Sequence, residues 1–289
     1  MFNGSYVALV TPFKNGEIDL ERLGGLVDFH VESGTDGLVP CGTTGESATL
    51  SHSEHELVIE FVIQRAAGRV PVLAGTGSNS TSEAISLTRS AQAAGADGAL
   101  VITPYYNKPP QEGLYRHFAA IAGECSIPIV LYNVPGRTGI DLLPETVARL
   151  SSYENVVAVK EASGSVDRTV EILAECDITV LSGDDSLTLA LMSVGAKGVI
   201  SVAANVVPSR MAELVHLAAA GDFAAAAPLP HQLYPLMKSL FIETSPIPVK
   251  ACMELQGLIE GELRLPLVEA REETREILRG ILAELELRV

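Results

Sequence analysis

Short apolar runs alternate with longer amphipathic segments along most of the chain. The runs are YVALVTP, GLVPCG, PVLAGT, GALVITP, PIVLYN, VVAVKE, ITVLSG and GVISVA. They are continuously apolar rather than alternating, which is typical of strands buried on both faces. The segments between them, such as SEHELVIEFVIQRAA and TSEAISLTRSAQAA, place apolar residues at helical spacing. Eight strands alternating with helices predict a parallel sheet, and favour a closed (β/α)8 TIM barrel over an open doubly wound sheet.

A glycine-containing phrase recurs at the junctions between these units. It reads SGTDGLV at 33–39, AGADGAL at 94–100 and VGAKGVI at 194–200. The second glycines of the first two copies are 61 positions apart, and the next interval is 100. These intervals fit two and three strand–helix units of about thirty residues. We expect the first glycine to end a helix in the left-handed conformation and the second to open a strand.

The last part of the chain reads as helical. The eighth strand is predicted to end near Val202, which leaves 87 residues. One helix should complete the barrel, and the remaining amphipathic segments predict further helices without a flexible linker. We therefore divide the chain into a catalytic barrel, residues 1–223, and a C-terminal helical extension packed on it, residues 224–289.

Composition limits the possible partners and location. The chain has 289 residues, 47% of them apolar, and no run approaches the length of a membrane-spanning helix. Its net charge of −16 argues against nucleic acid and anionic membranes as partners. The N-terminus lacks the basic and small-residue pattern of a signal peptide, and the four cysteines show no CxxC spacing. We expect a cytoplasmic protein without a zinc or disulfide framework.

The candidate chemistry lies where barrel enzymes place it, at the C-terminal ends of the strands. The run VVAV leads directly into Lys160. A lysine here is most often a surface or ion-paired residue. An enclosed amine, however, loses its charge more readily and becomes a nucleophile toward ketones, which favours Schiff-base chemistry.

Side chains at neighbouring strand ends fit this chemistry. A carbinolamine needs a proton shuttle, and Tyr132, Tyr106, Thr43 and Thr44 all lie at the ends of predicted strands. Each one alone is more often a structural tyrosine or a turn threonine. The GTTG turn also offers backbone N–H groups that could hold a carboxylate. Together these residues predict a site for an α-keto acid.

Motifs along nearly the whole chain resemble the dihydrodipicolinate synthase family, of the N-acetylneuraminate lyase superfamily of lysine-dependent barrel aldolases. The motifs are VALVTPF, GTTGESATL, AGTGSNSTSEAISLT, TPYYNKPPQEGLYRHF, LYNVPGRTGIDLLPET, VKEASG, LSGDD, GVISVAANV and PIPVK. The resemblance implies that Lys160 forms an imine with pyruvate, without a cofactor or metal. The derived enamine would attack L-aspartate-4-semialdehyde and give 4-hydroxy-tetrahydrodipicolinate, the first committed step toward diaminopimelate and L-lysine.

The resemblance also implies roles for the other residues. Tyr132 matches the general acid/base, and Thr43 and Tyr106 match its proton relay, with Tyr106 reaching in from a neighbouring subunit. The resemblance further implies three contacts to the substrates: the pyruvate carboxylate on Thr44, bound pyruvate beside the backbone of Ile200, and the carboxylate of the semialdehyde on Arg137. The alternative for Arg137 is a salt bridge within its loop.

The HSEHE stretch admits two interpretations. Its histidines could suggest a metal site, but the spacing is not HExxH, and Ser51 or Ser53 can simply cap the next helix. The resemblance implies instead a feedback site for L-lysine. Eight positions match that site, namely Ser47, Ala48, Leu50, His52, His55, Asn79, Glu83 and Tyr105.

Three alternatives remain at the level of sequence. Sister enzymes share the lysine but use other aldehydes; they include N-acetylneuraminate lyase, keto-deoxy-sugar acid aldolases and hydroxyproline-pathway deaminating dehydratases. A metal-dependent barrel aldolase would lose activity to chelators. A catalytically silent keto-acid or lysine binding protein would form no imine. GTTGES, paired Tyr105–Tyr106 and Arg137 favour the synthase, and the family implies a homo-oligomer, a tetramer built as a dimer of dimers.

Overall fold

The central element is an eight-stranded parallel sheet closed into a barrel. The computed structural model describes residues 2–288. The strand order is β4-β1-β10-β9-β8-β7-β6-β5, and Leu38 in β4 pairs with Val72 just before β5, which closes the ring. The strands are β1 (Gly4–Ala8), β4 (Gly37–Val39), β5 (Leu73–Gly75), β6 (Gly98–Ile102), β7 (Ile129–Asn133), β8 (Val156–Glu161), β9 (Thr179–Ser182) and β10 (Gly198–Ser201). The predicted (β/α)8 barrel is confirmed.

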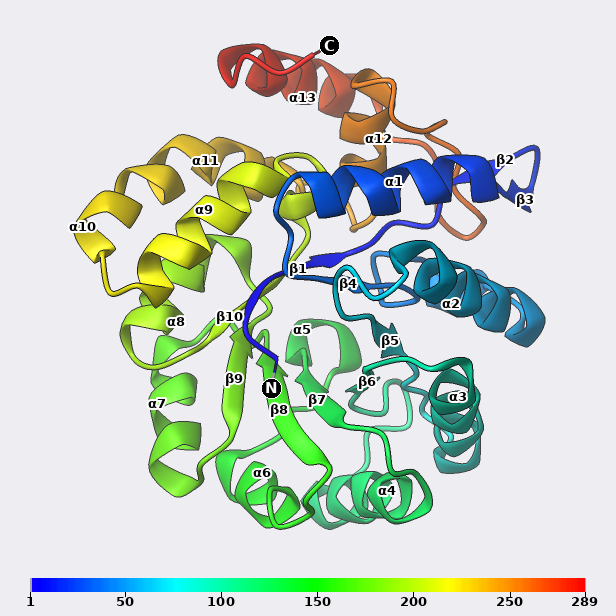
Figure 1. Ribbon diagram of the computed structural model, residues 1–289, viewed down its shortest axis with the longest axis vertical. Helices are drawn as coiled ribbons and strands as arrows, with labels where there is room; N and C mark the ends of the chain where they lie inside the picture. Colours follow the sequence, from blue (N-terminus) through cyan, green and yellow to red (C-terminus); the bar gives the residue numbers. More distant parts are fainter. Residues whose placement is uncertain (1, 289) are drawn as a thin grey trace.

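Helices surround the strands, as Figure 1 shows. Along the barrel they are α1 (Leu20–Glu32), α2 (His52–Ala66), α3 (Thr81–Ala94), α4 (Gln111–Glu124), α5 (Pro135–Thr138), α6 (Pro144–Leu150), α7 (Val166–Glu175), α8 (Thr188–Ser193) and α9 (Pro208–Ala219). A two-stranded hairpin, β2 (Phe13–Lys14) with β3 (Glu17–Ile18), follows β1. Ser51 caps α2, with its side chain accepting the N–H of Glu54, as one interpretation of HSEHE predicted.

The recurring glycine phrase does what its pattern predicted. Gly34, Gly95 and Gly195 have φ of 82°, 89° and 118°, so each lies in the left-handed region that glycine tolerates without strain. The second glycines open β4, β6 and β10. The phrase therefore marks three equivalent helix-to-strand junctions in the barrel.

The buried hydrophobic residues form two clusters, and strand β8 contributes side chains to both. Val159 belongs to the larger cluster that packs against the helices, whereas the adjacent Ala158 belongs to a smaller cluster that includes Leu181 and Ile200. Side chains alternate along a strand, so the smaller cluster fills the barrel interior. Lys160 lies two residues after Ala158 and therefore faces the interior too.

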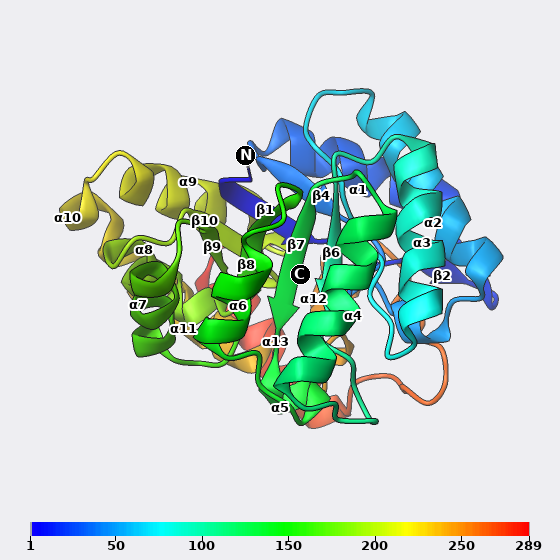
Figure 2. The ribbon, with the colours of Figure 1, turned by 90° about the horizontal axis from the view of Figure 1, so that it is seen from below.

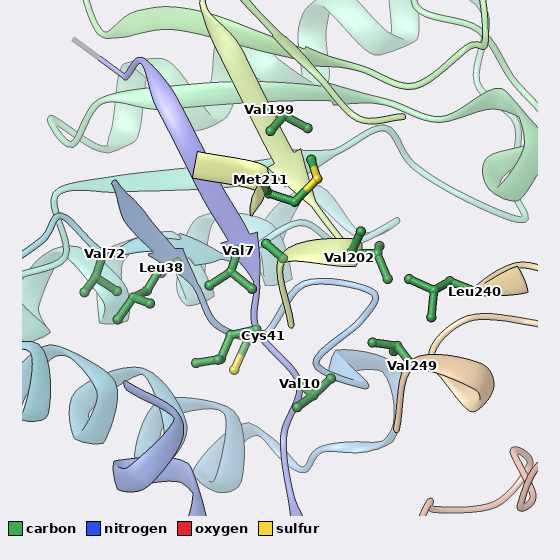
Figure 3. Packing of buried hydrophobic residues seen from close by; sticks show 14 of the residues in the cluster. Val7, Val10, Leu38, Cys41, Val72, Val199, Val202, Met211, Leu240 and Val249 are labelled. Atoms are coloured by element: carbon green, nitrogen blue, oxygen red, sulfur yellow. The ribbon is translucent and has the colours of Figure 1, made fainter. Parts of the chain in front are cut away.

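The C-terminal helices are α10 (Phe223–Ala226), α11 (Pro228–Ser239), α12 (Ile247–Leu255) and α13 (Glu272–Glu284). Figure 3 shows Leu240 and Val249, from this part of the chain, near Val202 and Val10 in the larger buried cluster. The predicted helix over PVKACMELQGLIE ends early, at Leu255, because the chain turns at Gly257 with φ of 73°.

The division proposed at residues 223 and 224 falls inside α10 and stays a prediction. For residues 2–288, the structure contains no helix long and apolar enough to cross a membrane.

Candidate active site

Lys160 is enclosed inside the barrel beside an aromatic ring. It is the penultimate residue of β8 and is only 6% exposed. The parallel register pairs it with Tyr132 on β7, and its Nζ lies 4.2 Å from the centre of that ring. Among residues 2–288, Lys160 makes no ion pair with a carboxylate. The amine is thus buried with a phenol as its neighbour rather than a counter-charge.

A cavity of about 80 Å³ surrounds this amine at the C-terminal end of the strands. It collects residues from several strand ends that are far apart in sequence. Six of the seven predicted catalytic and substrate residues line it, namely Thr43, Thr44, Tyr132, Arg137, Lys160 and Ile200. The barrel therefore brings together the residues that strand-end reasoning and the resemblance selected.

The turn Gly42–Glu46 forms one wall of the cavity. It is closed by two local hydrogen bonds, from the Gly45 N–H to the Gly42 carbonyl and from the Glu46 N–H to the Thr43 carbonyl, both 3.1 Å. Within residues 2–288, the N–H groups of Thr43 and Thr44 donate no hydrogen bond. Buried N–H groups are normally paired, so these two donors suit an anionic ligand.

Arg137 lines both the cavity around Lys160 and a second, larger cavity next to it. It is in the short helix α5, directly beyond the tip of β7 (Figure 2). Its Nη2 donates to the carbonyl of Ser245 at 3.3 Å, and no carboxylate among residues 2–288 pairs with it. The salt-bridge alternative is therefore not what the structure shows, and the guanidinium keeps donors for a ligand.

Tyr106 does not reach this cavity. It is 89% exposed, and its backbone φ of 71° places it in the left-handed region, unusual for a tyrosine. Within one chain, the predicted relay of Thr43, Tyr132 and Tyr106 is thus incomplete. This is the one predicted catalytic residue that the fold does not bring to Lys160.

The predicted L-lysine residues gather around the larger cavity, of about 490 Å³. Seven of the eight line it, namely Ser47, Ala48, Leu50, His52, His55, Glu83 and Tyr105. The eighth, Asn79, lies beside it, where its side-chain amide donates to the Tyr105 carbonyl at 3.1 Å. The two cavities share the lining residues Gly42, Thr43, Leu100, Tyr132, Arg137 and Ser245.

Glu83 is the acidic centre of this cavity. It accepts a hydrogen bond from the Ser78 hydroxyl and pairs with His52 Nε2 at 2.8 Å. These two contacts, the serine first, hold the pKa of Glu83 below its ordinary value. Burial lowers the pKa of the neighbouring His55. A fixed carboxylate in an accessible cavity suits a cationic ligand. No cluster of three or more possible metal ligands occurs in the described chain, residues 2–288.

Asp184 of the SGDDS segment belongs to the site and Asp185 supports it; sequence reasoning assigned a role to neither. Asp184 lines the lysine cavity, and burial raises its pKa. Asp185 is buried and accepts the N–H groups of Val202 and Ala203 at 3.1 and 2.8 Å. It thereby fixes the chain just after β10. The position of SGDD at the end of an apolar run was the signal for both.

Comparisons with known proteins identify relatives along nearly the whole chain. A model of the dihydrodipicolinate synthetase family matches residues 1–285. The 4-hydroxy-tetrahydrodipicolinate synthase of Persephonella marina is 56% identical over 288 residues, which is 98% of each chain. The crystal structure of dihydrodipicolinate synthase from Aquifex aeolicus is 53% identical with a TM-score of 0.98, and the match covers 100% of this chain and 99% of that one.

Two further solved structures are described with bound ligands. A chloride-inhibited dihydrodipicolinate synthase from Acinetobacter baumannii, complexed with pyruvate, is 46% identical with a TM-score of 0.98 over 99% of this chain and 100% of that one. The enzyme from Cyanidioschyzon merolae, with lysine bound, is 40% identical with a TM-score of 0.96 over 99% of both chains. The chain is therefore an enzyme of the lyase class and belongs to the dihydrodipicolinate synthetase family.

Proposed function

We propose that this enzyme condenses pyruvate with L-aspartate-4-semialdehyde to give 4-hydroxy-tetrahydrodipicolinate, the first committed step toward diaminopimelate and L-lysine. The observation that carries the proposal is the enclosed Lys160 amine, 4.2 Å from the Tyr132 ring and without an ion-pair partner. The family match and the pyruvate complex of the A. baumannii relative support the choice of keto acid.

Imine formation follows from this placement. The neutral Lys160 amine attacks the keto carbon, and the new C–N bond gives a carbinolamine. The two amine protons and the keto oxygen then leave as water. Tyr132 is the hydroxyl-bearing residue beside the amine, so it moves these protons, with Thr43 as the next relay member. The reaction needs no cofactor or metal, since the amine itself activates the ketone.

The turn at Gly42–Glu46 binds the keto acid. The N–H groups of Thr43 and Thr44 have no partner within residues 2–288 and can bind an anion. Thr44 holds the pyruvate carboxylate beside the Ile200 backbone. This contact orients the keto carbon toward Lys160. It also holds the methyl group that must lose a proton to form the enamine.

The second substrate completes the reaction. The enamine carbon attacks the aldehyde, and Arg137 holds the substrate's carboxylate through a forked guanidinium contact. The substrate's own amine then displaces the Lys160 nitrogen and closes the ring, which returns the free amine. For Arg137→Ala we expect intact imine formation with a severe loss in use of the semialdehyde.

Borohydride trapping tests the central step. Reduction in the presence of pyruvate should leave a pyruvyl adduct on Lys160, located by peptide mass mapping, and none in Lys160→Ala. Lys197→Ala is the matched control, because that lysine is exposed and precedes β10 at the opposite end of the barrel. If the wild-type enzyme gave no pyruvyl adduct, this result would contradict the proposal and favour a silent binding protein.

A separate assay identifies the aldehyde substrate. A coupled assay should show turnover with aspartate semialdehyde and none with N-acetylneuraminate or keto-deoxy-sugar acids, which are substrates of sister enzymes. Activity should persist in a chelator. Loss of activity there would instead favour a metal-dependent aldolase.

We further propose that the complete site needs a second copy of the chain, within a homotetramer built as a dimer of dimers. The exposed Tyr106 supports this proposal, since it cannot serve its own cavity. Mixing Tyr106→Phe with Lys160→Met subunits should restore one intact site per mixed dimer. Recovery of activity supports the shared site, whereas no recovery in verified mixed dimers would place Tyr106 outside the relay.

L-lysine is the proposed feedback inhibitor at the larger cavity. The gathered residues, the Glu83 carboxylate and the lysine complex of the C. merolae relative support it. Glu83→Gln should raise the lysine concentration needed for half inhibition, because it removes the charge that meets the ligand's amine. Full activity in saturating L-lysine, with no binding by calorimetry, would contradict the proposal.

A further inference from the structure

A second buried lysine lies outside the proposed chemistry. Lys250 is on α12, and its side chain is wholly enclosed, as is that of Glu46. Its Nζ lies 2.6 Å from Glu46 Oε1 and donates to the Thr11 carbonyl at 3.0 Å. It also lies 4.4 Å from the centre of the Phe13 ring. This amine is therefore held from three sides.

Both of its polar contacts lead to the turn that lines the active-site cavity. Glu46 closes that turn, two residues after Thr44. Its other carboxylate oxygen accepts the backbone N–H of Arg264 at 3.2 Å, so residues of the C-terminal part of the chain bind both oxygens. The turn is thus tied to segments more than 200 residues away.

Thr11 provides the second connection. Its hydroxyl donates to the carbonyl of Gly45 at 2.7 Å, while its own carbonyl accepts from Lys250. Lys250 consequently supports two adjacent residues of the turn, one directly and one through Thr11. Cys41, just before the turn, and Glu46, its last residue, both have φ of 55°, a conformation that non-glycine residues keep only when their surroundings enforce it.

Stability alone does not account for such a pair. Removing two charges from water is costly, and well-packed apolar residues often replace a buried ion pair without loss. Burial lowers the pKa of Lys250, against the opposing effect of Glu46. A pair retained at this cost, and attached to a turn that lies between Cys41 and Glu46 with their unusual backbone conformations, has a role in placing that turn.

We propose that Lys250 and Glu46 are a positioning pair, which fixes the Gly42–Glu46 turn so that the Thr43 and Thr44 N–H groups face the keto-acid carboxylate. The pair touches neither the cavity amine nor the substrate, and acts through the turn. This inference rests on the proposed function, because it assigns the pair to the pyruvate-binding half of that reaction.

Two variants test the pair while limiting the harm to folding. Glu46→Asp keeps both charges but draws the carboxylate back by one methylene. The double variant Glu46→Gln with Lys250→Met removes both charges at similar volume, so that neither charge remains buried alone. In both, folding is checked by circular dichroism and assembly by size-exclusion chromatography.

The readout separates positioning from stability. We expect KM for pyruvate to rise about tenfold or more, while KM for the semialdehyde changes less than about threefold. Borohydride trapping on Lys160 should fall at low pyruvate and recover at saturating pyruvate. A merely structural pair would lower the melting temperature and leave these three quantities unchanged.

Arg275→Met is the matched control. Its ion pair with Glu254, at 2.6 Å, also lies between C-terminal helices, α13 and α12, but does not touch the turn. KM for pyruvate should stay at the wild-type value there.

Each other outcome counts against one proposal or the other. A normal KM for pyruvate in both variants, or failure of both to fold, would overturn the positioning role. A wild-type enzyme that forms no imine on Lys160 would overturn the proposed function instead.

Discussion

The two buried lysines of this enzyme share a residue type and an aromatic neighbour but differ in their partners. Lys160 lies 4.2 Å from the Tyr132 ring centre in the smaller cavity and has no ion pair within residues 2–288. Lys250 lies 4.4 Å from the Phe13 ring centre, and its Nζ donates hydrogen bonds to Glu46 and to the Thr11 carbonyl. Both lysines are therefore buried, and they differ in whether a carboxylate pairs with the amine.

This difference indicates how one fold uses the same amine in two ways. A carboxylate at 2.6 Å favours the charged form, and a protonated amine is not a nucleophile. An enclosed amine that no carboxylate pairs with is free to attack a ketone, as proposed for Lys160. Four substitutions probe this contrast.

The largest effect is expected for Lys160→Met. Turnover should fall by at least about 10³-fold, because no other amine reaches the keto carbon. The free energy of unfolding should change by no more than about 1 kcal/mol, since no counter-charge is left behind. Turnover and urea unfolding at fixed protein concentration measure both. A loss of several kcal/mol would show that Lys160 is also a structural cation, and the contrast would fail.

Lys250→Met should show the reverse pattern in stability. The free energy of unfolding should fall by about 3–5 kcal/mol, because the substitution leaves the Glu46 carboxylate buried without its cation. Urea unfolding measures the loss, and adding Glu46→Gln should restore most of it. Wild-type stability in the single variant would mean that Glu46 is not a buried charge in need of Lys250.

Tyr132→Phe tests whether the ring or the hydroxyl matters beside Lys160. The ring contact remains, so stability should change little, while kcat should fall about 10²-fold through loss of the proton-transfer group. Tyr115→Phe is a suitable control, because its ring lies beneath Arg149 on the outside of the barrel. Unchanged turnover in Tyr132→Phe would remove the phenol from the proposed proton transfer.

The smallest effect is expected for Glu54→Gln, which removes a more exposed ion pair to the same C-terminal segment. Arg264 lies 2.6 Å from Glu54 and lowers its pKa to about 2, from an ordinary value near 4.5. The stabilisation is therefore complete above about pH 4.5 and is lost as the pH falls through 2. Urea unfolding should show a deficit of about 1 kcal/mol at pH 7 that shrinks below pH 4. A constant deficit at all pH values would argue against the charge.

The barrel was predictable because strands buried on both faces appear in the sequence as continuous apolar runs. Each apolar run became a strand, and the phrases around Gly34, Gly95 and Gly195 marked the helix ends. The hairpin β2–β3 was missed because each strand has only two residues. Its signal was Asn15–Gly16, with φ of 53° and 83°, a turn that apolar patterning does not register.

Some residues of the site could likewise be predicted from the sequence, and others could not. Lys160 and Tyr132 were predictable, since both end strands and the barrel register sets them side by side. Lys250 pairs with Glu46 across 204 residues and comes from a helix, so strand-end reasoning could not select it. An isolated lysine within the apolar stretch PIPVKACM was the available sign. The outward direction of Tyr106 depends on loop backbone that no periodicity describes.

One short segment lines both cavities. Gly42 and Thr43 face Lys160, and the chain runs on within a few residues to Ser47, Ala48 and Leu50 at the larger cavity. Exchanging this stretch between relatives would therefore carry substrate recognition and regulation together. An engineer who wants a feedback-resistant enzyme has to work with single side chains on α2 and α3, because transplanting the loop would disturb both tasks at once.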